Sequence, residues 1–344
     1  MNRLLVRGLA VAAALFVLAG CSVRTAAPEP GQYPPDDVVI TNALNHTYKW
    51  ANYRIELTNG FFQKSGDRPL WCKTLAAPQP VGDLDIGGGT ARGAVLGLVA
   101  NTGGTGNFLF VVAAYTTDGK KYTATNSVGF GDRTRIKDIR IENGEIVVDY
   151  LVRKYGESPA ARPTVPATSV LAIRNDTLAA KRTIGYLADA GGSQGTLDDL
   201  RKDGRVIVKE HSFPVELEDC GKARFLTVDY LPFHAYDFYL ADGQDNIICS
   251  FPGKYRSGWQ PSAVRGVALA DVNRDGLTDV IIITEYEPVK GSKETGPDLY
   301  ASVYFRKKNG FVADLDFDRN LNAARRNTDH NAVLGFAQEN PPQL

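Results

Sequence analysis

The sequence has no excess of charge of either sign, since 39 Lys and Arg residues balance 39 Asp and Glu residues in a chain of 344. Proteins that attract nucleic acids or anionic lipids through their electrostatic field usually carry a basic excess. Loss of an N-terminal segment with Arg3 and Arg7 would leave the balance close to zero. We therefore expect no nucleic-acid partner.

Histidine is scarce, and the HExxH and P-loop signatures are missing. The four histidines are His46, His211, His234 and His330, and none belongs to an HExxH pair. The sequence also has no P-loop. His234 lies in the aromatic stretch YLPFHAYDFYL, where a packed histidine is commoner than a catalytic one. We therefore predict no catalytic residues and expect a protein that is not an enzyme.

The N-terminal apolar run is short. Leu9–Ala19 follows Arg3 and Arg7, but it is too short to span a bilayer comfortably. A positive start and a short apolar run are typical of an export signal. The run ends in the sequence LAGC, whose last residue is Cys21, and the whole segment resembles the bacterial lipoprotein signal.

The resemblance implies that residues 1–20 are removed and that Cys21 becomes the lipidated first residue. Its acyl chains, palmitate among them, would anchor the protein by burying methylene groups in the membrane. Ser22 stands where an Asp favours retention at the inner membrane, so the resemblance implies an outer-membrane lipoprotein that faces the periplasm or the cell surface. The alternative is an ordinary signal peptide with an incidental cysteine.

Three further cysteines are present, Cys72, Cys220 and Cys249. An exported protein lies in an oxidising compartment, where disulfides persist. An odd number leaves at least one cysteine unpaired within the chain. Cys220 and Cys249 lie in the same expected domain, so we predict a disulfide between them, and Cys72 is then a buried thiol or pairs elsewhere.

Short apolar runs bounded by turn residues predict a mainly β protein with two antiparallel β-domains and minor helix. Four prolines between residues 21 and 40 resist both helix and central strand, and they predict a tether. The expected segments are a signal peptide over 1–20, the tether over 21–40, an N-terminal β-domain over 41–178, a linker over 179–204 and a C-terminal β-domain over 205–344.

Turn signals locate some elements within these segments. The dipeptide Asn143-Gly144 between alternating apolar runs is the strongest short hairpin signal in the sequence. We also expect a short helix over Leu197–Arg201 and a helix within the tail Leu321–Phe336. Predicted strands cover Tyr53–Thr58, Ala94–Val99, Phe108–Tyr115, Lys121–Asn126, Thr134–Glu142, Gly144–Arg153, Arg205–Lys209, Arg224–Asp229, Tyr236–Asp242, Asn246–Phe251, Val264–Ala270, Asp279–Tyr286 and Tyr300–Lys307.

The stretch DVNRDGLTD, residues 271–279, places oxygen-bearing side chains at alternate positions ahead of the apolar run VIIIT. Ca²⁺ takes about six to eight oxygen ligands, and short side chains in a tight loop can converge on one ion. Gly276 permits the sharp turn that a Cβ would obstruct. The predicted ligands are the side chains of Asp271, Asn273, Asp275 and Asp279 and the backbone carbonyl of Leu277.

The alternative is a solvated turn, because Asp, Asn and Gly are also ordinary turn residues. Three carboxylates at close range repel one another unless a cation or the solvent compensates, which favours a bound ion. A similar stretch in the first half keeps Asp83 and Asp85 but has Gly87 at the fifth position. The two halves are either divergent copies of one unit or similar by chance.

Two resemblances extend beyond the loop. Ile282 stands where an EF-hand needs a Glu, and a β-branched run follows, so DVNRDGLTDVIIIT resembles the loop-to-strand calcium sites of FG-GAP and VCBS repeats instead. The segments AVLGLVANTGGTGNFLFVVAAY and GFGDRTRIKDIRIENGEIVVDY resemble a domain of uncharacterised exported lipoproteins, in which an NTGG loop joins two strands. Neither resemblance implies a reaction.

The sequence thus predicts a non-enzymatic, lipid-anchored envelope protein with a structural Ca²⁺ loop, which serves as a binding or envelope-structural module. The membrane is its expected partner through the lipid anchor, with a protein or a glycan as a further partner. The rival function is a periplasmic metal-assisted hydrolase, which needs an open coordination position and a general base beside the loop. A deep acidic cleft that includes Asp271 would favour the hydrolase, and an exposed loop would favour the binding module.

Overall fold

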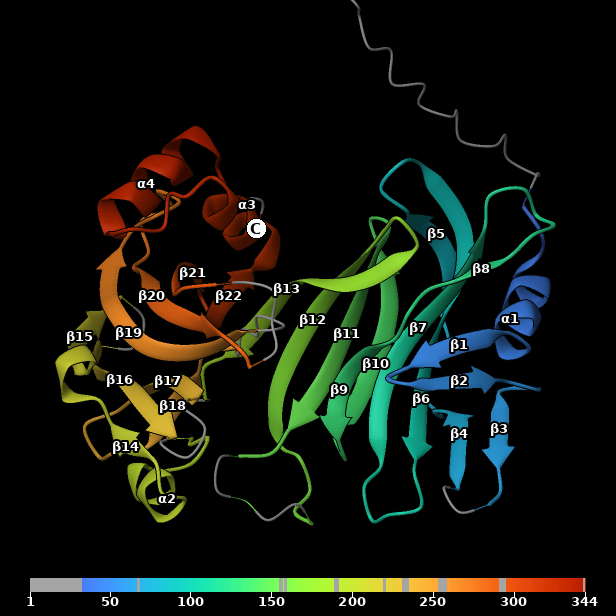
Figure 1. The fold of residues 1–344 in the computed structure, drawn as a ribbon, viewed down its shortest axis with the longest axis horizontal. Helices are drawn as coiled ribbons and strands as arrows, with labels where there is room; N and C mark the ends of the chain where they lie inside the picture. Colours follow the sequence, from blue (N-terminus) through green and yellow to red (C-terminus); the bar gives the residue numbers. More distant parts are fainter. Residues whose placement is uncertain are drawn as a thin grey trace, which may run out of the picture.

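The computed structural model describes residues 33–66, 69–154, 157, 160–188, 192–218, 221–230, 235–252, 259–290, 295–342 and 344. The predicted signal peptide and the lipidation site Cys21 lie outside the described residues, as does Cys220. In the described part the chain is mainly β, with several antiparallel sheets and the helices α1–α4, which confirms the predicted fold class (Figure 1).

The elements fall into two halves along the chain. Those of the first half are α1 (Asp36–Leu44), β1 (Thr47–Trp50), β2 (Tyr53–Glu56), β3 (Phe61–Lys64), β4 (Leu70–Thr74), β5 (Val81–Asp85), β6 (Thr90–Asn101), β7 (Phe108–Thr116), β8 (Thr123–Ala124), β9 (Val128–Asp132), β10 (Arg135–Glu142), β11 (Glu145–Val152), β12 (Val165–Arg174) and β13 (Thr177–Tyr186). Those of the second half are α2 (Leu197–Lys202), β14 (Val206–Ile207), a 3₁₀ turn (Lys209–His211), β15 (Phe213–Leu217), β16 (Gly221–Tyr230), β17 (Ala235–Ala241), β18 (Ile247–Ser250), β19 (Trp259–Ala270), β20 (Asp279–Pro288), β21 (Asp298–Lys307), β22 (Gly310–Asp314), α3 (Leu315–Ala323) and α4 (His330–Glu339).

The largest sheet joins the two halves. Its strand order is β10-β11-β12-β13-β22-β21-β20-β19, so four strands of the first half continue into four strands of the second. Figure 1 shows β13 between the two halves, beside β22. Strands β3–β9 form a seven-stranded sheet, β14–β18 a five-stranded sheet, and β1 with β2 a hairpin.

The structure differs from the expected linker at residues 179–186, which belong to β13. Ile184 pairs with Thr168 of β12 on one side and with Val312 of β22 on the other. The chain returns from β12 because Asn175 and Asp176 both adopt positive φ, at 49° and 60°, as a two-residue hairpin turn requires. The helix predicted at Leu197–Arg201 is confirmed as α2.

The structure also differs at the ends of the described chain. Helix α1 begins at Asp36, inside the expected tether, because Pro35 suits a helix start and Val39 and Ala43 are fully buried. The single helix expected in the tail is two helices. Asp314 caps α3 by accepting a 3.0 Å bond from the backbone N–H of Phe317, and Asp329 caps α4 in the same way.

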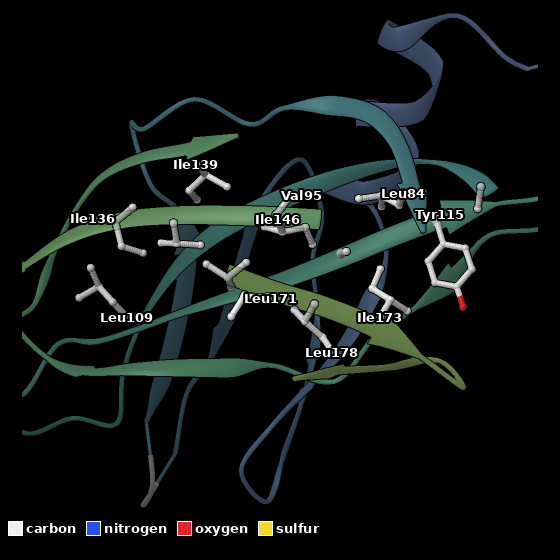
Figure 2. Packing of buried hydrophobic residues seen from close by; sticks show 14 of the residues in the cluster. Leu84, Val95, Leu109, Tyr115, Ile136, Ile139, Ile146, Leu171, Ile173 and Leu178 are labelled. Atoms are coloured by element: carbon white, nitrogen blue, oxygen red, sulfur yellow. The ribbon is translucent and has the colours of Figure 1, made fainter. Parts of the chain in front are cut away.

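The hairpin predicted at Asn143-Gly144 is confirmed. Both residues adopt positive φ, at 51° and 81°, and the turn pairs Ile141 with Ile146 and Ile139 with Val148. Figure 2 shows Ile139 and Ile146 among the buried side chains that lie between the seven-stranded sheet and strands β10–β12. Burial of this apolar face fixes the strand register, since a slip of one residue would expose it.

The second half has its own core between the five-stranded sheet and strands β19–β22. Phe225, Phe311 and Val280 are almost completely buried there. The helices α3 and α4 pack on the other face of β20 and β21 through Phe317 and Phe336. Among the described residues, no helix has the length and apolar character that crossing a bilayer demands.

Candidate calcium loop

The loop predicted to bind calcium connects two strands of the eight-stranded sheet. Strand β19 ends at Ala270 and β20 begins at Asp279, and these two residues pair across the sheet. The apolar run after the loop is the buried part of β20, with Val280, Ile281 and Ile282 each 1 % exposed. The loop therefore leads into a strand, as in the resemblance, and not into the helix that an EF-hand requires.

Three of the predicted ligands turn toward one another. The backbone N–H of Asp275 donates both to Oδ1 of Asp271, at 3.1 Å, and to Oδ1 of Asn273, at 3.2 Å. Nδ2 of Asn273 donates in turn to Oδ2 of Asp275 at 3.0 Å. Gly276 at φ 84° lets the chain make this turn, and its N–H donates to Asp271 as well.

Asp279 lies beneath the loop and is completely buried. Its Oδ2 accepts a 2.8 Å hydrogen bond from the N–H of Val272, and its Oδ1 accepts a 2.7 Å bond from the N–H of Arg306. The pKa of this carboxyl is raised from 3.8 to about 6, mainly by burial and to a smaller extent by the charge of Asp275, and backbone N–H donors, those of Val272 and Arg306 among them, oppose the rise. No ion pair involves Asp279 among the described residues.

Two charged side chains from neighbouring elements approach the loop. Oγ1 of Thr278 donates a 2.6 Å hydrogen bond to Glu218, and this bond is the main reason that the pKa of Glu218 lies below its usual range. Nζ of Lys307 lies 3.4 Å from Oδ2 of Asp275. Lys307 is therefore the one basic side chain paired with a loop carboxylate in the described part of the chain.

The donor types fit Ca²⁺ better than a softer metal, because the loop supplies carboxylate, amide and carbonyl oxygens. In the described residues, no group of three His, Cys, Asp or Glu side chains could hold a metal ion. A site at this loop thus needs the amide oxygen of Asn273 and the carbonyl of Leu277 in addition to the acids. Asp271 and Asp275 are exposed, so an ion can reach the loop directly from solvent.

The corresponding stretch of the first half already contains a cation from the protein. Arg92 forms ion pairs with Asp83, at 3.0 Å, and with Asp36 of α1, at 2.6 Å. Asp85 instead accepts a bond from the N–H of Gly87 within the β5–β6 turn. In the first half, therefore, an arginine of the protein compensates the charge of Asp83, whereas we predict a bound ion at residues 271–279.

The cysteine predictions are tested only in part. The predicted Cys220–Cys249 disulfide involves a residue outside the described part, so it stays a prediction; Cys249 itself is fully buried on β18. Cys72 is unpaired and fully buried on β4, and burial raises the pKa of its thiol to about 12. It is the buried thiol of the two alternatives.

The NTGG loop joins β6 to β7 as a tight connection. Asn101 holds it by donating from Nδ2 to the carbonyls of Gly104 and Gly106, at 3.1 and 2.7 Å. The stretch GDR, residues 131–133, contacts this loop, because Asp132 accepts a 2.7 Å hydrogen bond from the N–H of Asn107. Both stretches are visible in the sequence, but the contact between them is not, because it depends on the pairing of β7 with β9.

Sequence reasoning also missed a cavity between the two halves of the molecule. Its lining comes from residues between Val128 and Pro252, on strands of three different sheets. No local pattern marks residues that are so far apart in the chain. The tertiary fold brings them together, through the pairing of β13 with β22 and the packing of β13 against β18.

Comparison of the chain with protein-family models, with curated proteins and with solved structures gave no match.

Proposed function

We propose that the protein is a non-enzymatic, lipid-anchored envelope protein whose second half is stabilised by Ca²⁺ bound at residues 271–279. The ion would be held by the side chains of Asp271, Asn273, Asp275 and Asp279 and by the carbonyl of Leu277. Bound there, it would neutralise the acids and fix the connection between β19 and β20. The folded domains would then present a surface to a protein or glycan partner in the envelope.

The observation that carries this proposal is the position of Asp279. A completely buried carboxyl without an ion pair costs free energy when it ionises, and here the negative charge of Asp275 adds to that cost. The N–H donors of Val272 and Arg306 offset only part of this cost, since the pKa remains raised. A divalent ion that binds only the folded loop would offset the rest and stabilise the native state.

The rival hydrolase has less support. Asp271 and Asp275 are exposed on the loop instead of lining a deep cleft. Glu218 is a carboxylate from outside the loop that approaches it, and its bond to Thr278 gives it a partner within the loop itself. Neither the cavity between the two halves nor the smaller one beside α3 includes a residue of the loop.

Thermal melting of the soluble fragment 22–344 tests the metal part of the proposal. Saturating Ca²⁺ should raise the melting temperature by roughly 5 °C over the value in excess chelator, because the ion binds the native state selectively. Mg²⁺ at the same concentration should have a much smaller effect, since it prefers a tighter octahedral shell with water ligands. An identical midpoint with Ca²⁺ and with chelator would contradict the proposal.

Fractionation of cells that express the full chain tests the anchor part. The wild-type protein should sediment with membranes, and the Cys21→Ser variant should move to the soluble periplasmic fraction, because it cannot be acylated. Cys72→Ser is the matched control and should stay with the membranes. Retention of the Cys21→Ser variant would show that a lipid at this residue is not the anchor.

A further inference from the structure

A cavity of about 510 Å³ lies where three sheets converge. Strands β11, β12 and β13 of the eight-stranded sheet form one side of it. Strand β9 of the seven-stranded sheet and strands β17 and β18 of the five-stranded sheet provide the other walls. Cavities of this size, at the junction between two parts of a protein, commonly hold small molecules.

Aromatic side chains give the cavity an apolar lining with a few polar positions. The rings of Phe130 and Tyr150 meet edge to face, with centroids 4.9 Å apart. The hydroxyl of Tyr150 lies 3.3 Å from Oγ of Ser169, and that of Tyr186 lies 3.0 Å from Oγ1 of Thr168. Such a lining can pack against a ring while the hydroxyl groups orient its polar substituents.

The charged side chains of the lining are Arg153 and Asp237. Asp237 forms an ion pair with Arg205, so its charge is compensated within the protein. The guanidinium of Arg153 donates to the backbone carbonyl of Asp132, from Nη1 and Nη2, at 3.2 Å each. Among the described residues, no carboxylate pairs with Arg153, so its positive charge is available to a ligand.

The walls of the cavity are fixed to one another. Gln194 is buried, and it donates to the carbonyl of Tyr186 at 2.6 Å while its Oε1 accepts from the N–H of Ser250 at 2.9 Å. A Cβ at Gly185 would lie 2.8 Å from the carbonyl oxygen of Ser250, so this glycine permits the close approach of β13 to the end of β18. The cavity is therefore formed before any ligand arrives, which lowers the entropic cost of binding.

We propose that this cavity binds a small organic anion that carries a ring. The anionic group, a carboxylate or a phosphate, pairs with the guanidinium of Arg153, which suits both geometries. The ring packs against Phe130 and Tyr150. This site is separate from the loop at residues 271–279 and does not depend on Ca²⁺.

Isothermal titration with 2-naphthoate and with its uncharged analogue 2-naphthamide tests the proposal. The carboxylate should bind at least about tenfold more tightly than the amide, because a charge-assisted hydrogen bond is lost with the amide. Arg153→Gln should remove that difference, whereas Arg153→Lys should keep most of it. Arg54→Gln, on an exposed arginine outside the cavity, is the control and should leave both affinities unchanged. Titration with 1-naphthyl phosphate then separates a carboxylate site from a phosphate site.

A second variant fills the cavity instead of changing its charge. Ala167 lines the cavity on β12, and Ala167→Phe should abolish binding of both naphthyl compounds. Circular dichroism and the melting temperature identify any variant that fails to fold, and the remaining variants then decide the outcome. The proposal is overturned if 2-naphthoate does not bind, if the amide binds equally well, or if the folded Arg153→Gln or Ala167→Phe protein binds like the wild type.

Discussion

The backbone N–H of Arg306 donates a 2.7 Å hydrogen bond to Oδ1 of Asp279. It connects the first residue of β20 to β21, and the bond from Val272 to the other oxygen closes the loop above it. A single buried carboxylate therefore joins two strands and the loop between β19 and β20. Asp279 is thus both a structural acceptor and a predicted calcium ligand, and these two roles are separable by mutation.

Asp279→Ala should destabilise the protein even without calcium. The change leaves the N–H groups of Val272 and Arg306 without an acceptor in the protein interior, which costs on the order of 3 kcal/mol. Urea denaturation of the metal-free protein at about pH 4, where the contribution of the protonated carboxyl is complete, measures the free energy of unfolding. Asp275→Ala is the comparison, since its loop bonds are exposed and its loss should cost less than about 1 kcal/mol under the same conditions. Equal losses in the two variants would contradict this account of Asp279.

The raised pKa of Asp279 predicts a pH dependence in chelator. The folded state binds the proton more tightly than the unfolded chain, because the pKa rises from 3.8 to about 6. The stability that this group contributes is therefore complete below about pH 4 and is lost as the pH rises through about 6. The total change is on the order of 3 kcal/mol.

Unfolding free energies of the wild-type and Asp279→Ala proteins across this pH range check the pH prediction. The difference between the two proteins should become smaller as the pH rises, because only the wild type loses the contribution of the protonated carboxyl. Parallel curves would show that Asp279 ionises normally in the folded protein.

Gly144→Ala should destabilise the β10–β11 hairpin. Gly144 has φ 81°, and a Cβ there would lie 3.0 Å from the backbone nitrogen of Asp85. We expect a loss of about 2 kcal/mol in urea denaturation, from strain and from this contact. Gly88→Ala is the matched control, because no atom lies within 4 Å of its added Cβ and its φ is not positive. That variant should change stability by less than about 0.5 kcal/mol.

Cys72 should be inert in the folded protein. Burial raises the pKa of its thiol to about 12, so very little thiolate exists near neutral pH, and the sulfur is inaccessible as well. Mass spectrometry after treatment with iodoacetamide should find the Cys72 peptide unmodified at pH 8 and fully modified in denaturant. Rapid modification of the native protein would mean that β4 opens readily.

Local signals predicted the parts of the fold that depend on local chemistry. Asn143-Gly144 marks a hairpin because two adjacent residues must adopt positive φ. Asn175-Asp176 makes the same kind of turn, but the segment from residue 178 to residue 204 has few β-branched residues and several glycines, so β13 was not predicted. The union of β13 with β22 joins residues far apart in the chain, which no local pattern specifies.

The candidate sites also differ in whether the sequence alone could predict them. The loop at residues 271–279 could be found from sequence because all of its donors lie within nine consecutive positions. The buried position of Asp279 could not, since it depends on the N–H of Arg306 from a different strand. The cavity beside Arg153 could not either, because its walls come from three sheets.

Calorimetric titration of Ca²⁺ into the metal-free protein tests the central proposal most directly. The wild type should bind one ion per chain, and Asp275→Ala should lose measurable binding while it remains folded. Asp85→Ala is the matched control, because Asp85 also accepts a bond within a turn, from the N–H of Gly87, and this variant should bind like the wild type. Absence of heat in the wild type, or an unchanged isotherm in Asp275→Ala, would contradict a calcium site at this loop.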